Sequence, residues 1–345
     1  FFFGWDRLSK PAHLMVTWLV AIGTSFSALW ILIANGWMQH PVGAVFNPIT
    51  MRMEMTSFYD VVVNPVAQAK FVHTVSAGYV LGSVFVLGIS AWYLLKGRHI
   101  GLARRSITVA ASFGLAGALS VVVLGDESGY DAGENQQMKL AAIEAMWNTE
   151  PAPASFTLFG LPDQEARETK YAIHIPWVMG LIGTRSLTEP IEGINQLEAK
   201  AKARIRDGIL AYDAVMKMRE NPQNAGDSGL RMQFEQHSDD FGHALLLLRY
   251  TEDPRLATEA QIAQAAEDTI PHVWPVFWAF RIMAGLGFTF ILTMAFFFWR
   301  SSFCGQTYPR WALWLAVVMT PTPWIAIEAG WIVAEYGRQP WTVDG

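Results

Sequence analysis

Long apolar runs recur along this chain, and they predict membrane-spanning helices. A helix needs about 20 apolar residues to cross a hydrocarbon layer about 30 Å thick. Five runs are long enough: 14–34, 72–95, 107–124, 276–299 and 311–334. The first three contain no formal charge, whereas the fourth contains Arg281 and the fifth contains Glu328. A buried helix of a large soluble protein could explain one such run, but it explains five in one chain poorly.

A polar segment, 126–271, separates the third run from the fourth. Helical periodicity is visible in QQMKLAAIEAMW, INQLEAKAKARIRDGILAYDAVMKMRE and TEAQIAQAAEDTI, and breakers such as EPAPAS, LPDQ and NPQNAGDSG lie between them. The pattern therefore predicts an all-α protein, a polytopic transmembrane helix bundle with a large, mostly helical loop outside the hydrocarbon.

This reading divides the chain into three parts. Residues 1–125 would hold the end of one span, marked by FFF, and three full spans; 126–271 would form the loop, and 272–345 two further spans. The chain opens without an initiator Met and closes directly after a predicted helix. We therefore interpret it as an internal portion of a longer membrane protein.

The low fraction of charged residues agrees with a membrane protein, and the distribution of basic residues predicts how the spans are oriented in the bilayer. Only 16% of residues are charged and 52% are apolar, against about 25% charged in a typical soluble domain. Eight basic residues fall in 1–13, 96–106 and 300–310, which lie on one side if the spans alternate. By the positive-inside rule that side is cytoplasmic. The segment 126–271, with 24 of the 30 acidic and 13 of the 25 basic residues, is then extracytoplasmic.

Two side chains near span ends are candidate haem ligands. Among eight histidines only His73 begins a span, next to small residues that leave room beside the helix, and Met283 lies at the same predicted depth in the fourth span. A His/Met pair makes a six-coordinate, electron-transferring haem. The alternative is that Met283 fills apolar space and His73 is an interfacial residue. The single cysteine, Cys304, excludes an internal disulfide and a CxxC metal site.

Charges inside the spans are costly, so they are candidates for function. Arg281 needs an anion, which could be a haem propionate or the carboxylate of Glu328 or Glu335. Glu335, in GWIVAEYGRQPW, could be a snorkelling carboxylate, a proton carrier or a metal ligand. The residues alone do not choose among these alternatives, and Glu328 faces the same ones.

The order of several motifs resembles subunit I of the cytochrome bd quinol oxidases along nearly the whole chain. The matching stretches include GWDRLSKPAHLMVTWLVAIGTSFSALWILIANGWMQHP, NPVAQAKFVHTVSAGYV, KLAAIEAMW, PAPASFTLFGLPDQ, AFRIM and EAGWIVAEYGRQPW. The last is the most specific, because its charged and aromatic residues are not typical of an apolar helix. The resemblance implies a bacterial cytoplasmic membrane protein that couples quinol oxidation to reduction of O2 to water. It also implies a low-spin haem b, a high-spin haem b and a haem d.

The resemblance implies roles for individual residues. His73 and Met283 match the axial ligands of the low-spin haem b, and Arg281 matches the Arg beside it. Glu335 matches the carboxylate ligand of the high-spin haem b, and Arg338 is similar to an Arg near haem propionates. Trp331 is expected to pack against a porphyrin. Glu328 has no implied role, and the haem d ligand is expected outside this portion.

The loop 126–271 resembles the long form of the family's quinol-binding loop. Lys139 and Glu144 match residues associated with quinol oxidation: a Lys can hydrogen-bond a quinone carbonyl and a Glu can accept a proton. Both could instead be ordinary charges on an amphipathic surface helix. The implied partners are ubiquinol or menaquinol, O2, the lipid bilayer, a second large membrane subunit and a small single-helix subunit, with no nucleic acid.

Two other classes of protein are the alternatives. A haem-bearing membrane anchor of a quinol dehydrogenase would usually show His/His pairs and would need no carboxylate ligand. A haem-free secondary transporter would use Glu328, Glu335 and Arg281 as a coupled ion site, but it gives no reason for so large a loop.

Overall fold

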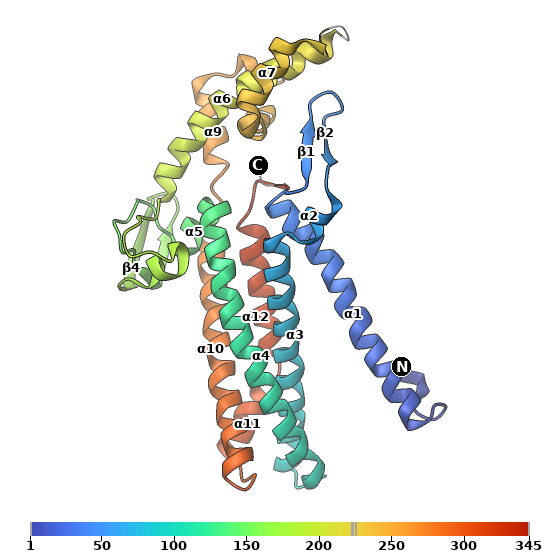
Figure 1. Ribbon diagram of the computed structural model, residues 1–345. Coiled ribbons are helices and arrows are strands. Elements are labelled where there is room, and N and C mark those ends of the chain that lie inside the picture. Colours follow the sequence, from blue (N-terminus) through green and yellow to red (C-terminus); the bar gives the residue numbers. More distant parts are fainter. Residues whose placement is uncertain (1, 222–223, 225, 344–345) are drawn as a thin grey trace.

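The computed structural model describes residues 2–221, 224 and 226–343 as a helix bundle with a polar region at one end (Figure 1). The long helices are α1 (Lys10–Gln39), α3 (Pro65–Leu95), α4 (Ile100–Asn135) and α10 (Val273–Phe303), and the last span consists of α11 (Arg310–Val318), α12 (Thr322–Trp331) and the π-helical turn η7 (Ile332–Tyr336). α3, α4, α10 and α11–α12 run side by side, whereas α1 leans away from them (Figure 1). We call the end of the bundle that carries α5 to α9 the loop end.

The five predicted spans are confirmed, since five helical segments are long and apolar enough to cross a membrane. Each helix extends beyond its apolar run. α4 continues to Asn135, so it crosses the predicted boundary between residues 125 and 126. Of the FFF stretch, Phe1 lies outside the described residues and Phe2–Gly4 form the 3-10 turn η1.

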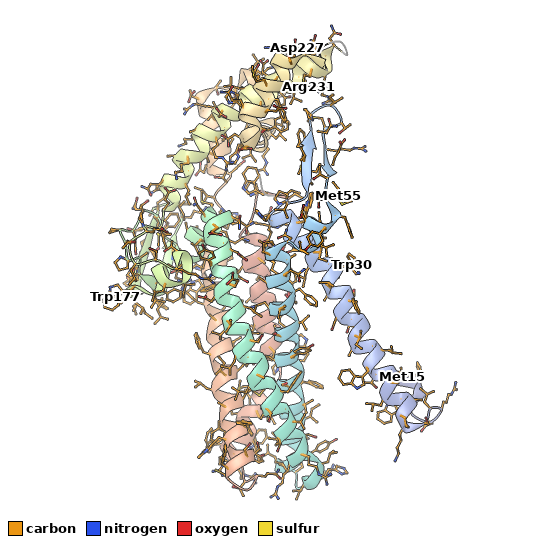
Figure 2. The ribbon with its side chains drawn as sticks, in the orientation of Figure 1. Met15, Trp30, Met55, Trp177, Asp227 and Arg231 are labelled. Carbon is orange, nitrogen blue, oxygen red and sulfur yellow. The ribbon has the colours of Figure 1, made fainter. Side chains whose placement is uncertain are left out.

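The bundle core is apolar and built on close approach of helices. It joins α3, α4, α10 and α11 through buried side chains that include Leu87, Ile107, Met294, Phe297 and Ala316. In lipid such packing, rather than a hydrophobic driving force, holds helices together. α1 contributes little to this core, and Met15 and Trp30 on it are 59% and 55% exposed (Figure 2).

Polar caps fix the crossing of α1 and α3. The Asn64 side chain accepts a hydrogen bond from the backbone N–H of Val66 at 3.0 Å, which caps α3, and donates to the carbonyl of His40 at 2.8 Å, just after α1. Pro65 occupies the first helical position, where its missing N–H costs nothing.

The last span is interrupted at two places. α11 ends at Val318 and α12 begins at Thr322, because Pro321 and Pro323 cannot donate the hydrogen bonds that would continue one helix. The chain then widens into η7, where the N–H of Gly337 donates to the carbonyl of Ile332 at 3.3 Å. Wide turns of this kind are frequent at functional sites, and Glu335 lies inside this one.

The loop is mostly helical, as predicted, and also contains strands. Its elements are α5 (Gln137–Glu144), β3 (Phe156–Asp163), β4 (Glu168–Ile175), η2 (Gly180–Thr184), α6 (Ile194–Glu220), α7 (Ser228–His237), η4 (Ser238–Asp240), α8 (Phe241–Leu245), η5 (Leu246–Arg249), η6 (Pro254–Leu256) and α9 (Glu259–Glu267). A shorter hairpin, β1 (Ala44–Asn47) with β2 (Arg52–Met55), and the helix α2 (Phe58–Val62) lie between α1 and α3. Neither hairpin was expected from the sequence. The β3–β4 register shifts twice, so the period-two alternation that marks a strand is broken.

Side-chain contacts attach the loop to the bundle. Gln164, in the turn of the β3–β4 hairpin, accepts a hydrogen bond from the N–H of Val273 at the start of α10, at 3.1 Å. Within the loop, Arg167 from the same turn pairs with Glu198 of α6 at 2.5 Å. Phe46 of β1 packs against Phe241 of α8, with ring centroids 5.0 Å apart.

Gly36 and Gly23, both on α1, form a matched pair for testing the α1–α3 crossing. A Cβ at Gly36 would lie 2.6 Å from the Cα and Cβ of Ala67, whereas one at Gly23 would meet nothing within 4 Å. We expect Gly36→Ala to lower the free energy of unfolding by about 1–3 kcal/mol through overpacking. Gly23→Ala should leave it unchanged or raise it by up to about 1 kcal/mol, because Ala favours helix. Thermal unfolding in one detergent measures both, and equal stabilities would contradict the close crossing.

Candidate functional site

A cavity of about 450 Å³ lies inside the bundle towards its loop end, between α1, α3, α4, α10 and α12. We call it the bundle cavity. Four of the predicted site residues line it, namely His73, Met283, Trp331 and Lys139. Most of its wall is apolar, and the polar side chains gather where the helices reach the loop end. Such a pocket is typical of a cofactor site.

His73 and Met283 enter the bundle cavity from different helices, α3 and α10, and each faces a glycine. A Cβ at Gly125 would lie 3.5 Å from His73 Cε1, and one at Gly330 would lie 3.1 Å from Met283 Sδ. His73 Nδ1 is buried and forms no hydrogen bond of good geometry with the described residues, although the backbone of Val121 is close enough to act on the imidazole. A buried imidazole nitrogen of this kind needs an explanation, and a bound haem iron would provide one. The residues present therefore fit a haem held by His73 and Met283.

Arg281, between the cavity-lining residues Phe280 and Met283 of α10, is held by protein groups. Its Nη1 donates to the carbonyls of Ile143 at 2.7 Å and Phe277 at 3.0 Å. Its Nη2 donates to the Thr157 carbonyl and lies 3.4 Å from the Glu144 carboxylate. The alternative salt bridge from Arg281 to Glu328 or Glu335 is not formed, because Glu144 from the loop supplies the anion.

Glu144 is buried by this arrangement, and its side chain is 1% exposed. Its carboxylate also accepts a hydrogen bond from the Thr157 N–H at 2.8 Å. Burial raises the pKa of Glu144 to about 7, although Arg281 and the Thr157 N–H act to lower it. A carboxyl with a pKa near neutrality can take up and release a proton.

Lys139 is buried as well, so neither predicted quinol residue is a solvated surface charge. Lys139 Nζ donates to Gln136 of its own helix and lies 3.5 Å from Gln39 Oε1 of α1. It also packs beside Gly337, just after η7. Lys139 and Glu144 are five positions apart on α5 and thus point to different sides. The structure places Lys139 at the bundle cavity and Glu144 against α10 and β3.

Glu335 is held by two partners, one on each oxygen. Asn35 of α1 donates to Oε1 at 2.7 Å, and Arg338 donates to Oε2 at 2.9 and 2.7 Å through Nε and Nη2. Glu335 does not line the bundle cavity. A charge-assisted pair of this geometry favours the ionised carboxylate, which is the form a metal ion binds.

Three polar residues near these groups escaped the sequence analysis as site candidates: Asn35, Gln39 and Lys70, all lining the bundle cavity. Asn35 Oδ1 accepts from Gln39 Nε2 at 3.0 Å and from Lys70 Nζ at 3.3 Å. A signal was present, because Asn35 and Gln39 are four residues apart in an apolar helix and therefore share a face. Lys70 is one turn before His73.

The residues proposed for a transporter do not form one site. Arg281 pairs with Glu144 and Glu335 pairs with Arg338. Glu328 is exposed on α12 and forms no hydrogen bond or ion pair with the residues that the structure describes. In that same part of the chain, no group of three or more His, Cys, Asp or Glu side chains could hold a metal ion.

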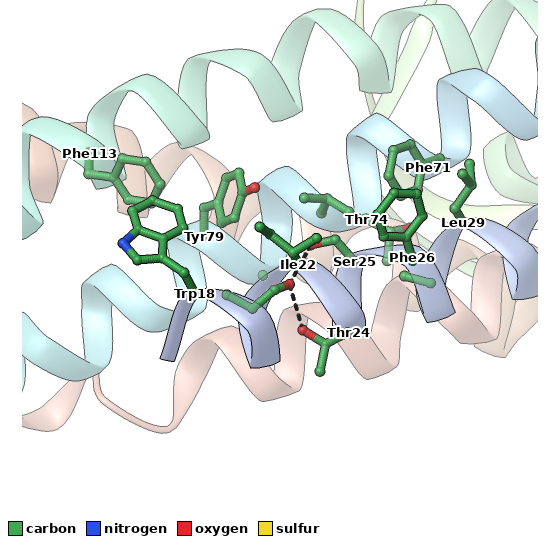
Figure 3. A pocket seen from close by; sticks show the side chains of 14 residues that line it. Trp18, Ile22, Thr24, Ser25, Phe26, Leu29, Phe71, Thr74, Tyr79 and Phe113 are labelled. Atoms are coloured by element: carbon green, nitrogen blue, oxygen red, sulfur yellow. Dashed lines mark hydrogen bonds between the residues drawn. The ribbon is translucent and has the colours of Figure 1, made fainter. Parts of the chain in front are cut away.

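A second hollow lies between α1, α3 and α4 (Figure 3). It has a volume of about 770 Å³ and is lined by apolar and aromatic side chains such as Trp18, Phe71 and Phe113. Its hydroxyl groups at Thr24 and Ser25 donate to the Ala21 carbonyl of their own helix at 2.9 and 3.0 Å. It carries no acid, base or ligand set, so the chemistry lies in the bundle cavity and beside η7.

Comparison with known proteins matches residues 1–345 to the family described as cytochrome bd terminal oxidase subunit I. The chain is 46% identical over 344 residues to cytochrome bd-II ubiquinol oxidase subunit 1 of Escherichia coli, covering 100% of this chain and 66% of that protein. It is 29% identical to cytochrome bd ubiquinol oxidase subunit 1 of Bacillus subtilis, covering 99% and 60%. The chain thus spans less than two thirds of the length of these curated relatives.

A solved structure shares the fold. The bd oxidase of Geobacillus thermodenitrificans superposes with a TM-score of 0.70 at 24% identity, covering 99% of this chain and 62% of the solved one. The likeness supports the helix-bundle architecture described above.

The raised pKa of Glu144 predicts a dependence of stability on pH. The ordinary pKa of 4.5 applies to the unfolded chain and about 7 to the folded one. Between these values the folded protein holds a proton that the unfolded chain releases, so the contribution of Glu144 to stability falls as the pH rises from about 4.5 to about 7. We expect Glu144→Gln to remove this part of the slope in unfolding experiments. Glu165→Gln, on an exposed turn, is the control and should retain it; an unchanged slope in Glu144→Gln would contradict the assignment.

Proposed function

The chain belongs to the family of cytochrome bd terminal oxidase subunit I, and from this premise we propose that it is the haem-bearing core of a membrane quinol oxidase. The enzyme oxidises quinol at the outer face of the membrane and reduces O2 to water. The observation that carries the proposal is the bundle cavity, which His73 and Met283 both line from different helices.

His73 and Met283 hold a low-spin haem b in the bundle cavity. The opposing glycines, Gly125 and Gly330, leave room beside the two ligands. Trp331 from α12 contributes an aromatic wall. When bound, the haems supply the electron transfer and the reduction of O2.

Glu335 holds a second, high-spin haem b outside the bundle cavity. Asn35 and Arg338 each occupy one side of its carboxylate and keep it ionised and oriented. The wide turn η7 supports this role, because it sets the direction of Glu335 without a break in the span. A haem d completes the set, with its ligand on a part of the protein beyond this chain.

Quinol is oxidised at α5. Lys139 hydrogen-bonds a quinol oxygen, and Glu144 accepts a proton as the head group is oxidised. Arg281 fixes the Glu144 carboxylate from α10, the same helix that carries Met283, so the proton acceptor and the haem ligand share one rigid support.

The protein is a multi-pass component of the bacterial inner membrane, with 126–271 on the periplasmic side. This orientation follows from the basic loops at the opposite end of the bundle. Its partners are ubiquinol or menaquinol, O2, a second large membrane subunit and a small single-helix subunit. A haem-free transporter is disfavoured, since Arg281, Glu328 and Glu335 do not meet.

Ligand substitution tests the two haem sites. In the purified full-length complex we expect Met283→Leu to lose the low-spin signal of the reduced-minus-oxidised visible spectrum. Glu335→Ala should lose the high-spin signal, because each variant removes one iron ligand. Met294→Leu, a buried Met on the same helix, is the control for Met283 and should leave the spectrum unchanged. A wild-type complex without haem would overturn the oxidase and favour the transporter.

Substitution in α5 tests the quinol site separately. We expect Glu144→Gln and Lys139→Met to lower the quinol oxidation rate by about 100-fold, the contribution of a positioned acid or base, with unchanged haem spectra. Glu165→Gln is the control on the loop surface. Full activity in both α5 variants would mean that quinol is oxidised at another site.

A further inference from the structure

We propose that Lys70 binds a carboxylate of the ligand in the bundle cavity, namely a propionate of the haem held by His73 and Met283. The inference rests on the proposed function and adds to it a residue that anchors the haem by charge.

Lys70 is placed to reach the same ligand as His73. The two residues are three apart on α3, so they lie one above the other on one face of the helix. Both line the bundle cavity. Lys70 is nearer the loop end, where the cavity becomes polar, and its stem is partly buried. A ligand bound through His73 would therefore lie within reach of the Lys70 side chain.

The other cations nearby are bound to protein groups. Lys139, which also lines the cavity, donates to Gln136 and Gln39. Arg281 is held by Glu144 and three carbonyls. Arg338 is held by Glu335 and by the carbonyls of Trp341 and Thr342. Arg281 thus has an anion in the protein and does not need a propionate to balance its charge.

Lys70 differs from these arginines. Its Nζ has three donors, yet its hydrogen bond within the described chain goes to the neutral Asn35 amide oxygen at 3.3 Å. No carboxylate among the described residues forms an ion pair with it, although Glu335 and Asp131 are close enough to attract it and Arg338 to repel it. An ammonium so placed can accept a carboxylate without losing an existing salt bridge.

The ligand needs such a cation. A haem brings two propionates, and burying an ionised carboxylate without a partner is costly. Asp131 also lines this cavity, so its charge adds to the cost for a second anion. Lys70 offsets both. The competing explanation is that Lys70 merely balances Asp131 and Glu335 and makes no contact with the haem.

Infrared spectroscopy of the haem propionates separates the two explanations. The full oxidase complex is prepared with haem labelled with ¹³C at the propionate carboxyl groups, and redox difference spectra are recorded for wild type and Lys70→Gln. We expect the labelled carboxylate bands to shift in Lys70→Gln. The midpoint potential of the low-spin haem should also fall, because removing a nearby positive charge favours the oxidised iron.

Lys70→Arg keeps the charge and should keep the midpoint potential. Lys170→Gln, an exposed lysine of β4 paired with Asp163, removes a charge remote from the cavity and should leave both readouts at wild-type values. Unchanged bands and potential in a haem-loaded Lys70→Gln complex would overturn the inference. If that variant does not assemble, Lys70→Arg decides alone: shifted propionate bands support the contact, and unshifted bands overturn it. A wild-type complex without low-spin haem would instead overturn the proposed function.

Discussion

A positive charge buried in an apolar bundle must be neutralised by a neighbour, and at Arg281 this requirement joins the loop to the membrane helices. The side chains of Arg281 and Glu144 are 7% and 1% exposed. The same guanidinium holds carbonyls from α5, β3 and α10. Removing one partner of such a pair typically costs about 3–5 kcal/mol, because the other charge stays buried. The position of α5, and with it that of Lys139 beside the bundle cavity, thus depends on this ion pair together with the apolar packing of Ala141, Ala142 and Ile143 against α10.

The polar groups form two sets on either side of the bundle cavity. One is Arg281 with Glu144, between α10 and the loop. The other is Glu335 with Arg338 and Asn35, between η7 and α1. Each set carries its own charge compensation, so the apolar space between them can accept a large, flat, mostly apolar ligand.

The sequence predicted those features that depend on local composition. Span length follows from runs of apolar residues, and the five spans are confirmed. The partner of Arg281 was missed, because Glu144 is more than a hundred residues away in the chain and nothing local joins the two. The β3–β4 hairpin was missed because its bulges break the alternation. Lys70 was not a candidate, since only the fold reveals that it lines the same cavity as His73.

Because of the wide turn η7, the number of residues in the last span decides which of its side chains face α1. An α-helix turns about 100° per residue, and a π turn takes in one extra residue without ending the helix. Glu335 faces Asn35 because of this extra residue. If one residue were deleted before the motif GWIVAEYGRQPW, a neighbour of Glu335 would face α1 in its place. Spacing in this stretch therefore determines which side chain faces α1 as much as the identity of the residues does.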